Sequence, residues 1–311
     1  MELRRSTAAA GLVALLLLDV VLIVWALWPS STAAAMRSTT SVASSSGQPT
    51  TDGAAATAAP TLPASAGTPA PLVRLLAGVS PTTAWLVEGG ECGQPARLHV
   101  TLDGGAEWAT QLAPGSVTRI RPSDASSAFV VGGDADCAAR VWYTGDRGGT
   151  WSAALAATNA WGRGPDDSRL VLRPGGEPVQ PCLAGEVLDL VGFSRGDAVA
   201  LCGDGAVRTT SDSGATWTTT IARQGLLAIS LTSSGEGAVV RLADDCPGLT
   251  VSALDGGRIG ASECVGGVSY TPGQVAISVT DGAVWLVAGD GVYRADVVGT
   301  PFTRVSTWPE P

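Results

Sequence analysis

The chain lacks lysine altogether and contains a single histidine, His99. Only 15% of its residues are charged, and the formal net charge is −9. An acidic chain without a basic cluster lacks the electrostatic footprint of nucleic-acid binding, so we expect no nucleic acid among its partners. A lone histidine with no cysteine pair at ligand spacing does not make a zinc site. We therefore predict that His99 is a structural residue of a strand over Arg97–Thr101 and that no cofactor is bound.

Catalytic signatures are missing as well. The sequence contains no serine nucleophile elbow, no phosphate-binding loop and no cysteine nucleophile motif. Acidic residues recur beside several cysteines, at Glu91, Asp134, Asp136, Asp244 and Asp245. A calcium site needs about six to eight oxygen ligands, and the sequence shows no such convergence. We interpret these residues as solvated loop acids and predict no metal site.

One long apolar run stands near the N-terminus, over Ala9–Trp28. Its length at ~1.5 Å per residue spans ~30 Å, which matches the hydrocarbon core of a membrane. Arg4 and Arg5 precede it, so the positive-inside rule predicts a single-pass cell-membrane protein with residues 1–8 in the cytoplasm and the rest outside. A cleaved signal peptide ending near Ala33–Ala35 is the alternative. We favour an uncleaved anchor because the run exceeds the usual ~7–15 residues of a signal peptide.

Asp19 lies near the middle of this apolar run. A carboxylate at that depth costs about 2.5–3.5 kcal/mol on insertion scales, which makes an intramembrane partner one explanation. The other is that a very apolar helix tolerates one protonated acid, and we favour that explanation.

Residues 29–71 consist almost wholly of Ser, Thr, Ala, Pro and Gly. Such a segment lacks the large apolar residues that offset the entropy of ordering a chain, so we predict a disordered linker. Its expected role is to space the following domain, residues 72–311, from the membrane.

Three octets share the pattern Thr-x-Asp-x-Gly-x-x-Trp. We expect each to close a β-hairpin turn: the Asp carboxylate accepts backbone N–H groups, the glycine supplies a positive φ, and the Trp buries apolar area as the next strand begins. Two weaker copies follow, one with Asp255 and Gly257 but Gly260 in the Trp place, and one at Val292–Asp296 with Phe302 as the aromatic residue. The pattern residues of the full copies are Thr101, Asp103, Gly105, Trp108, Thr144, Asp146, Gly148, Trp151, Thr210, Asp212, Gly214 and Trp217.

The octets resemble the Asp-box, or bacterial neuraminidase (BNR), repeat of sialidases. They are also similar to repeats of photosystem II stability and assembly factor propellers and of sortilin-type receptor domains. The resemblance covers roughly Leu72–Val305. It implies an all-β fold, a β-propeller of four-stranded blades in which each octet joins the third and fourth strands.

The spacing of the octets bears on the number of blades. Asp103, Asp146, Asp212 and Asp255 are 43, 66 and 43 residues apart, and a four-stranded blade takes ~40–45 residues. We predict five blades, with an insertion over Asn159–Glu186 in the long interval. Six blades, two of them compressed into that interval, are the alternative. Apolar runs at Ser127–Val131, Asp197–Leu201 and Ala283–Ala288 are predicted strands.

Six cysteines in an exported chain suggest disulfides. The blade interpretation places all six on the face opposite the octet turns and favours sequential pairing, with free buried thiols as the alternative. The predicted pairs are Cys92–Cys137, Cys182–Cys202 and Cys246–Cys264.

The resemblance raises a sialidase activity, which relies on an arginine triad, a Tyr nucleophile with a Glu partner, and an Asp acid/base. Here Thr118–Pro122 matches the family's Phe-Arg-Ile-Pro motif only in part and follows the first octet rather than preceding it. Tyr143, Tyr270 and Tyr293 are the only tyrosines. No carboxylate is singled out as a catalytic acid. We therefore predict a non-catalytic member of this superfamily.

A rigid propeller on a tether suits binding, because loops on rigid scaffolds carry recognition. We predict an adaptor or assembly module for an exported or envelope protein. An envelope protein that binds or hydrolyses glycans, for example of the cell wall, is the alternative. The insertion Asn159–Glu186 is the candidate interaction loop, since Trp and Arg are enriched at interface hot spots; an ordinary surface loop is the other explanation. Its candidate residues are Trp161, Arg163, Arg169 and Arg173.

Overall fold

The computed structural model describes residues 73–309 except Gly90 and Ser233. The predicted cytoplasmic segment, the apolar run with Asp19, and the linker lie outside the described residues. Within the described part, no helix is long and apolar enough to cross a membrane.

Six antiparallel sheets, numbered 1 to 6 in chain order, make up the described residues. Sheet 1 consists of β1 (Val73–Gly78), β2 (Ala84–Gly89), β3 (Arg97–Thr101) and β4 (Ala109–Leu112). Sheet 2 consists of β5 (Arg119–Pro122), β6 (Ala128–Gly133), β7 (Ala139–Thr144) and β8 (Leu155–Ala156). Sheet 3 consists of β9 (Gly162–Arg163), β10 (Val171–Arg173) and β11 (Gly176–Val179).

The second half of the chain repeats the four-stranded arrangement three times. Sheet 4 consists of β12 (Val187–Gly192), β13 (Ala198–Cys202), β14 (Ala206–Thr210) and β15 (Thr218–Ala222). Sheet 5 consists of β16 (Leu226–Leu231), β17 (Glu236–Arg241), β18 (Gly248–Asp255) and β19 (Arg258–Gly266). Sheet 6 consists of β20 (Ala276–Thr280), β21 (Ala283–Ala288), β22 (Gly291–Ala295) and β23 (Thr303–Thr307).

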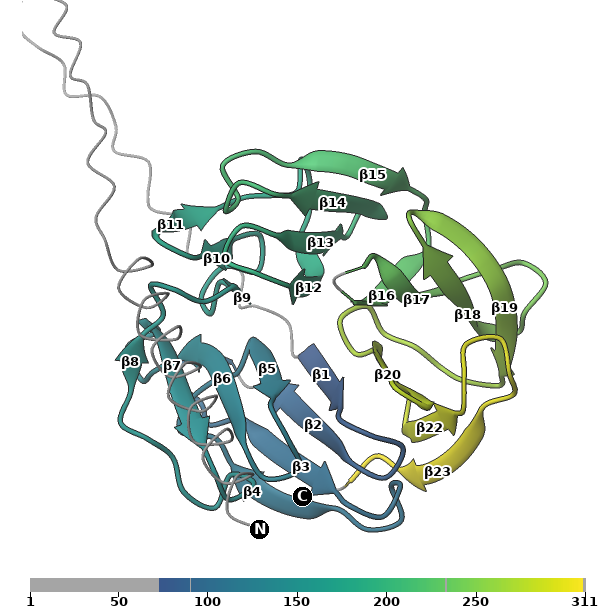
Figure 1. Cartoon of the computed structure of the whole chain (residues 1–311), viewed down its shortest axis with the longest axis horizontal. Coiled ribbons are helices and arrows are strands. Elements are labelled where there is room, and N and C mark those ends of the chain that lie inside the picture. The colour runs from purple at the N-terminus through teal and green to yellow at the C-terminus, as the bar shows by residue number, and fades with distance from the viewer. Residues whose placement is uncertain (1–72, 90, 233, 310–311) are drawn as a thin grey trace, which may run out of the picture. The chain divides into compact units, whose positions relative to one another are not determined.

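The sheets stand around a common centre, with β1, β5, β12, β16 and β20 innermost (Figure 1). This arrangement defines a six-bladed β-propeller. The predicted all-β propeller is confirmed, but the predicted count of five blades is wrong and the alternative of six is correct. The interval between Asp146 and Asp212 holds an additional three-stranded sheet, β9–β11, where we expected an insertion.

Burial explains why these segments form strands at these radial positions. Second strands have a neighbouring sheet on each face and are therefore apolar along their length; β13 and β21 are buried at every residue. Fourth strands lie at the rim, and every residue of β4 is exposed.

The ring closes between sheets 6 and 1 without a shared strand. Hydrogen bonds join the two sheets instead: Gly78 N–H donates to Ser278 Oγ at 2.9 Å, and Trp285 Nε1 donates to the Ser80 carbonyl at 3.1 Å. A buried cluster with Leu86 and Trp285 packs across this joint.

Sheet 3 lacks its innermost strand. Thr118 Oγ1, just before β5, donates to the Arg163 carbonyl, and Arg119 in β5 donates to the Trp161 carbonyl. The partners follow each other in opposite chain order, so β9 runs antiparallel to β5. The inner strands of the other sheets run in the direction of β5, so β9 corresponds to a second strand. The side chain of Arg119 occupies the gap and donates to the carbonyls of Trp161 at 2.9 Å and Gly192 in β12 at 3.0 Å.

The three full octets share one hydrogen-bond pattern at the turn between third and fourth strands. In the third copy, Thr210 Oγ1 donates to Asp212 Oδ1 at 2.8 Å and accepts the Gly214 N–H at 3.0 Å. The same carboxylate oxygen accepts the Thr216 N–H at 2.9 Å. The glycines have φ of 96°, 87° and 80°. These bonds, with the Thr216 hydroxyl the largest contributor, lower the pKa of Asp212 to about 2.

The fourth, weaker copy has a different turn. Asp255 ends β18, and Gly256 and Gly257, both at positive φ, connect it directly to β19. A two-residue turn of this kind requires positive φ at both positions, which glycine supplies.

The disulfides of the structure are the three predicted pairs, Cys92–Cys137, Cys182–Cys202 and Cys246–Cys264. Because strands alternate in direction, turns between first and second strands lie on the same face as the octet turns. We call this the octet face. The cysteines lie at the ends or connections on the other side, the cysteine face. Cys92–Cys137 links sheets 1 and 2, and Cys246–Cys264 lies within sheet 5.

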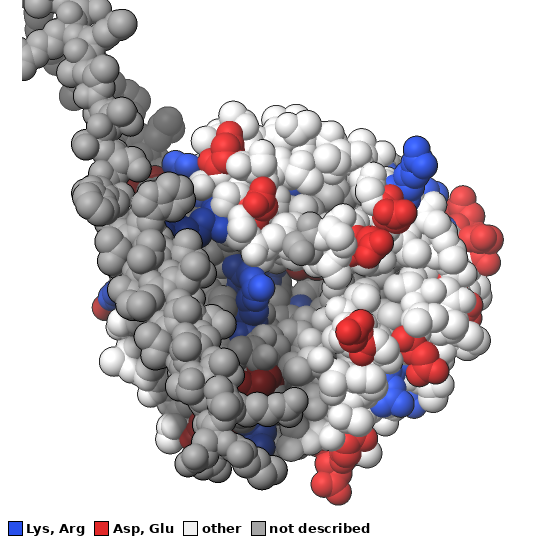
Figure 2. Space-filling model, viewed as in Figure 1, with Lys and Arg blue, Asp and Glu red and all other residues white. Residues whose placement is uncertain are grey.

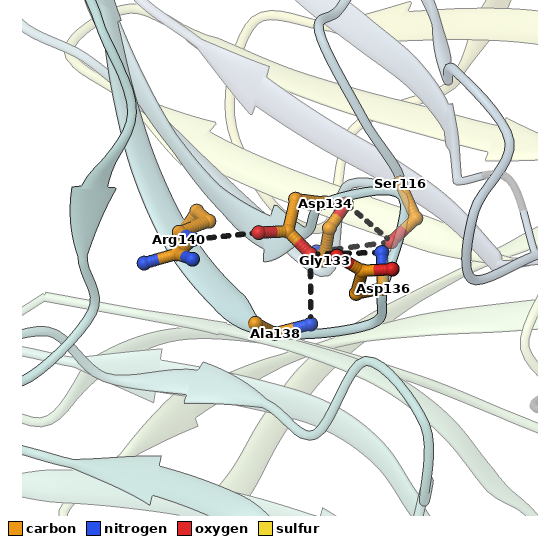
Figure 3. Close-up of polar contacts among 6 residues, drawn as sticks. All are labelled: Ser116, Gly133, Asp134, Asp136, Ala138 and Arg140. Carbon is orange, nitrogen blue, oxygen red and sulfur yellow. Dashed lines mark hydrogen bonds and ion pairs between the residues drawn. The ribbon is translucent and has the colours of Figure 1, made fainter.

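Asp134 organises the turn that contains Cys137, the disulfide partner of Cys92. Figure 3 shows its contacts with Ala138 and Arg140. One carboxylate oxygen accepts the N–H groups of Asp136 and Ala138, each at 3.0 Å, and the other pairs with Arg140 Nε at 2.7 Å. Cys137 itself has a positive φ of 66°. Asp134, which we interpreted as a solvated loop acid, therefore holds a strained turn in place.

Candidate functional site

The inner strands enclose a central cavity of about 490 Å³. Arginine surface lies at the edge of the central opening in Figure 2. Four arginines and one carboxylate, Asp189, line the cavity, although the chain as a whole is acidic. The arginines are Arg74, Arg119, Arg121 and Arg163.

Two of these arginines each donate to two backbone carbonyls. Arg119 bridges sheets 2, 3 and 4, and burial lowers its pKa to about 10, so it remains charged at neutral pH. Arg163 is only 5% exposed and donates to the carbonyls of Val187 and Leu188. Both side chains hold the ring together around the missing strand of sheet 3.

Asp189 is the single acid of the cavity, and its oxygens are also engaged. They accept the N–H groups of Leu190 at 2.8 Å and Ile229 at 3.0 Å, which ties β12 to β16. Burial raises the pKa of Asp189, while Arg163 and these N–H groups oppose that shift. Each oxygen of this carboxylate therefore already accepts a hydrogen bond from the propeller backbone.

Arg121 differs from the buried arginines. It is exposed at the octet-face end of β5 and donates to the Gly192 carbonyl at 3.1 Å. It borders a second hollow of about 390 Å³ between sheets 2 and 3, which we call the cationic groove. Three arginines line this groove, the third being exposed Arg195, and no carboxylate does. Tyr143 and Leu155, each about half exposed, give it an apolar wall.

A third hollow, of about 500 Å³, lies between sheets 4 and 5 on the same face. We call it the apolar groove. Its walls include buried Val199, Val207 and Leu254 and partly buried Ile221 and Leu231. Arg258 is its one charged lining residue.

The octet aromatic residues explain why these two crevices are open. In sheets 1, 2 and 4 the octet Trp packs against the preceding sheet. Trp108 Nε1 donates to Ser306 Oγ of sheet 6 at 3.1 Å, and Trp151 Nε1 to the Leu112 carbonyl of sheet 1 at 3.1 Å. Trp217 meets Trp161 of sheet 3 edge-on, with ring centroids 6.1 Å apart.

In sheet 6, Phe302 fills the corresponding place and packs on the core shared with sheet 5. Sheet 3 has no octet, since β10 and β11 are joined by Pro174 and Gly175 alone. Sheet 5 has Gly260 where the Trp would stand. No octet aromatic residue fills the crevice between sheets 2 and 3, which is the cationic groove. None fills the crevice between sheets 4 and 5, which is the apolar groove.

The predicted interaction loop requires correction. Residues 159–186 contain sheet 3 and are not a surface insertion. Trp161 is 3% exposed, and its Nε1 donates to the Ser194 carbonyl at 2.7 Å. Arg163 is buried, and Arg173 donates to the carbonyls of Glu177 and Ser213. Only Arg169 is exposed, paired with Asp167 at 2.7 Å.

Arg121, Arg195 and both grooves were not predicted from the sequence. The signal that could have found the grooves was present in the octets, because a missing or substituted Trp marks each open crevice. At the partial Arg-Ile-Arg-Pro motif, Arg119 donates to two backbone carbonyls. Among the residues described, no group of three or more His, Cys, Asp or Glu is arranged to hold a metal ion.

Comparison with known proteins gives matches among solved structures only. No family model and no curated protein sequence matches the chain. A structure of YCF48 bound to D1 peptide matches with 18% identity and a TM-score of 0.28 over 72% of this chain. The chain spans 65% of the length of that protein.

Two further matches come from other propeller proteins. The WD40 β-propeller domain of Doa1 has 11% identity and a TM-score of 0.41, over 72% of this chain and 91% of that domain. A GH74 enzyme from Niastella koreensis has 14% identity and a TM-score of 0.40, over 72% of this chain and 45% of the enzyme. At these identities no ligand or activity is transferred, and the propeller assignment rests on this chain's own sheet order.

Proposed function

We propose that the chain is a membrane-anchored, extracytoplasmic propeller that binds an acidic, extended segment of another exported protein and acts as an adaptor or assembly module. The anchor and the orientation follow from the apolar run Ala9–Trp28 and the arginines before it. The binding role follows from the octet face. We place the site there and not on the cysteine face.

The cationic groove is the observation that carries this proposal. Arg121 and Arg195 are exposed beside an apolar wall, and neither forms an ion pair with a described residue. A planar guanidinium matches a carboxylate in two parallel hydrogen bonds. Arginine and tyrosine are also the residue types enriched at protein interfaces. The chain as a whole has a net charge of −9 and repels acidic groups, whereas the arginines of this groove attract them locally.

Fluorescence anisotropy of the full chain in detergent tests the proposal. The probes are a labelled peptide rich in Glu and a matched peptide with Gln at the same positions. We expect the acidic peptide to bind more tightly, with an affinity that falls as salt rises. The double variant Arg121→Gln/Arg195→Gln should weaken its binding ~10-fold or more, since hydrogen bonds to charged groups contribute about 1.5–3 kcal/mol each.

Arg223→Gln is the matched control, because Arg223 is exposed and lies outside both grooves. It should leave affinity unchanged. Equal binding of the Glu and Gln peptides would overturn the proposal. A glycan array probed with the same protein tests the alternative ligand class, and selective binding to neutral glycans would favour that class.

A further inference from the structure

We infer that the ligand is bipartite: an extended polypeptide whose acidic part lies in the cationic groove and whose aliphatic part lies in the apolar groove. The inference rests on the proposed function and extends it to a second subsite. It names the chemistry of the partner segment, acidic side chains followed or preceded by Val-, Ile- or Leu-like side chains.

Phe193 connects the two grooves. This partly buried residue lies in the turn between β12 and β13 and borders the cationic groove, the central cavity and the apolar groove. Its N–H donates to the Asp197 carbonyl at 3.0 Å, which fixes the turn. Leu231 likewise borders both the central cavity and the apolar groove. The three hollows are therefore neighbours, and we take them as the track along which one ligand lies.

Charge along the track favours an acidic chain. The two grooves contain arginines and no carboxylate in their linings. Asp189 in the cavity is the single acid along the way, and backbone N–H groups occupy both of its oxygens. The linings of the three hollows together therefore hold six arginines and one carboxylate.

The lining of the apolar groove favours aliphatic side chains over sugars. Five Val, Leu and Ile side chains and Phe193 line it beside three hydroxyl residues, whereas a sugar presents many hydroxyl groups that each need a hydrogen-bond partner when buried. The turn at Gly256 and Gly257 leaves the groove uncovered, because a Cβ at either glycine would meet no atom within 4 Å. The crevice that Trp fills in other sheets is thus free to accept apolar groups from outside.

Selection from a displayed library of random peptides on the full chain in detergent tests the inference. We expect enriched sequences to contain Asp or Glu residues separated from a group of aliphatic residues. Thr220→Trp introduces an aromatic side chain at an exposed strand position that lines the apolar groove. This variant should keep the acidic preference, lose the aliphatic one, and bind the selected peptides ~10-fold more weakly.

Thr219→Trp is the matched control, one residue away on the same strand, exposed and outside the groove. It should select the same peptides as the unaltered chain, and Arg121→Gln/Arg195→Gln should lose the acidic preference while keeping the aliphatic one. Acidic peptides without any aliphatic preference in the unaltered chain would overturn the bipartite ligand and leave the proposed function standing. Enrichment without acidic residues would overturn the proposed function itself.

Discussion

His99 lies fully buried in β3, where its Nδ1 is 2.9 Å from Thr110 Oγ1. Its ring also meets Trp308 edge-on, with centroids 6.0 Å apart. Burial is the main reason why its pKa falls to about 4, with the charge of Arg97 adding to the effect. The neutral ring is thus part of the packing of sheet 1, as its place in a predicted strand suggested.

The folded protein should therefore lose stability as the pH falls from about 6.5 to about 4. The unfolded chain binds a proton on His99 over this range and the folded chain does not, so unfolding is favoured by up to about 1.4 kcal/mol per pH unit. Above pH 6.5 His99 is neutral in both the folded and the unfolded chain, so it no longer makes stability depend on pH. Denaturant unfolding of the unaltered chain and of His99→Gln, measured at several pH values, checks this. Equal slopes between pH 6.5 and 4 would contradict it.

The octet residues show which structural roles of single residues could be predicted from the sequence. The carboxylate, hydroxyl and glycine roles follow from short-range geometry, because all partners lie within a few residues in the chain. The role of Trp161 could not be predicted in this way. A Trp in an apparent loop suggests an exposed hot spot, but its burial depends on Trp217, which is distant in sequence.

At the scale of elements, sheet 3 is the irregular member of the ring. Its inner place is taken by the Arg119 side chain, which donates to Trp161 and Gly192 carbonyls. Strands β8 and β9 have only two residues each, too few for any hydrophobic period to reveal them. Longer second strands were predictable, and the expected segment Ala283–Ala288 coincides with β21.

Replacing Arg119 with methionine should lower the free energy of unfolding by about 3 kcal/mol, because two carbonyls of the inner ring lose a charged donor. Arg121→Met serves as the control on the same strand, since this exposed side chain makes one carbonyl bond. Its effect should be clearly smaller. Chemical denaturation of both variants measures the difference, and equal losses would argue against the bridging role.

At the scale of the whole molecule, the ring is held by side-chain bonds, packing and disulfides. Sheets 6 and 1 meet without a shared strand, and sheets 1 and 2 are joined covalently by Cys92–Cys137. The disulfide pairs were predicted correctly once the blade frame placed each cysteine on one face. Composition alone could not choose among the many pairings.

Removing Cys92–Cys137 by a double Cys→Ser change should lower the free energy of unfolding by about 4 kcal/mol, because it frees a loop of 45 residues in the unfolded chain. Removing Cys246–Cys264, which closes 18 residues within sheet 5, should cost about 3 kcal/mol. Denaturant unfolding under non-reducing conditions compares the two variants. A larger loss for the pair within sheet 5 would contradict the loop-entropy explanation.

The sequence by itself determined the all-β class, the turn chemistry of the octets and, within the blade frame, the disulfide pairs. The turn chemistry follows from residues that are close in the chain, and the all-β class and the blade frame follow from the resemblance of the octets to a known repeat. Only the tertiary structure decided that there are six blades, that Arg119 replaces an inner strand, and that two open grooves meet at Phe193. Each of these depends on which sheets become neighbours, and the packing of distant segments sets that arrangement.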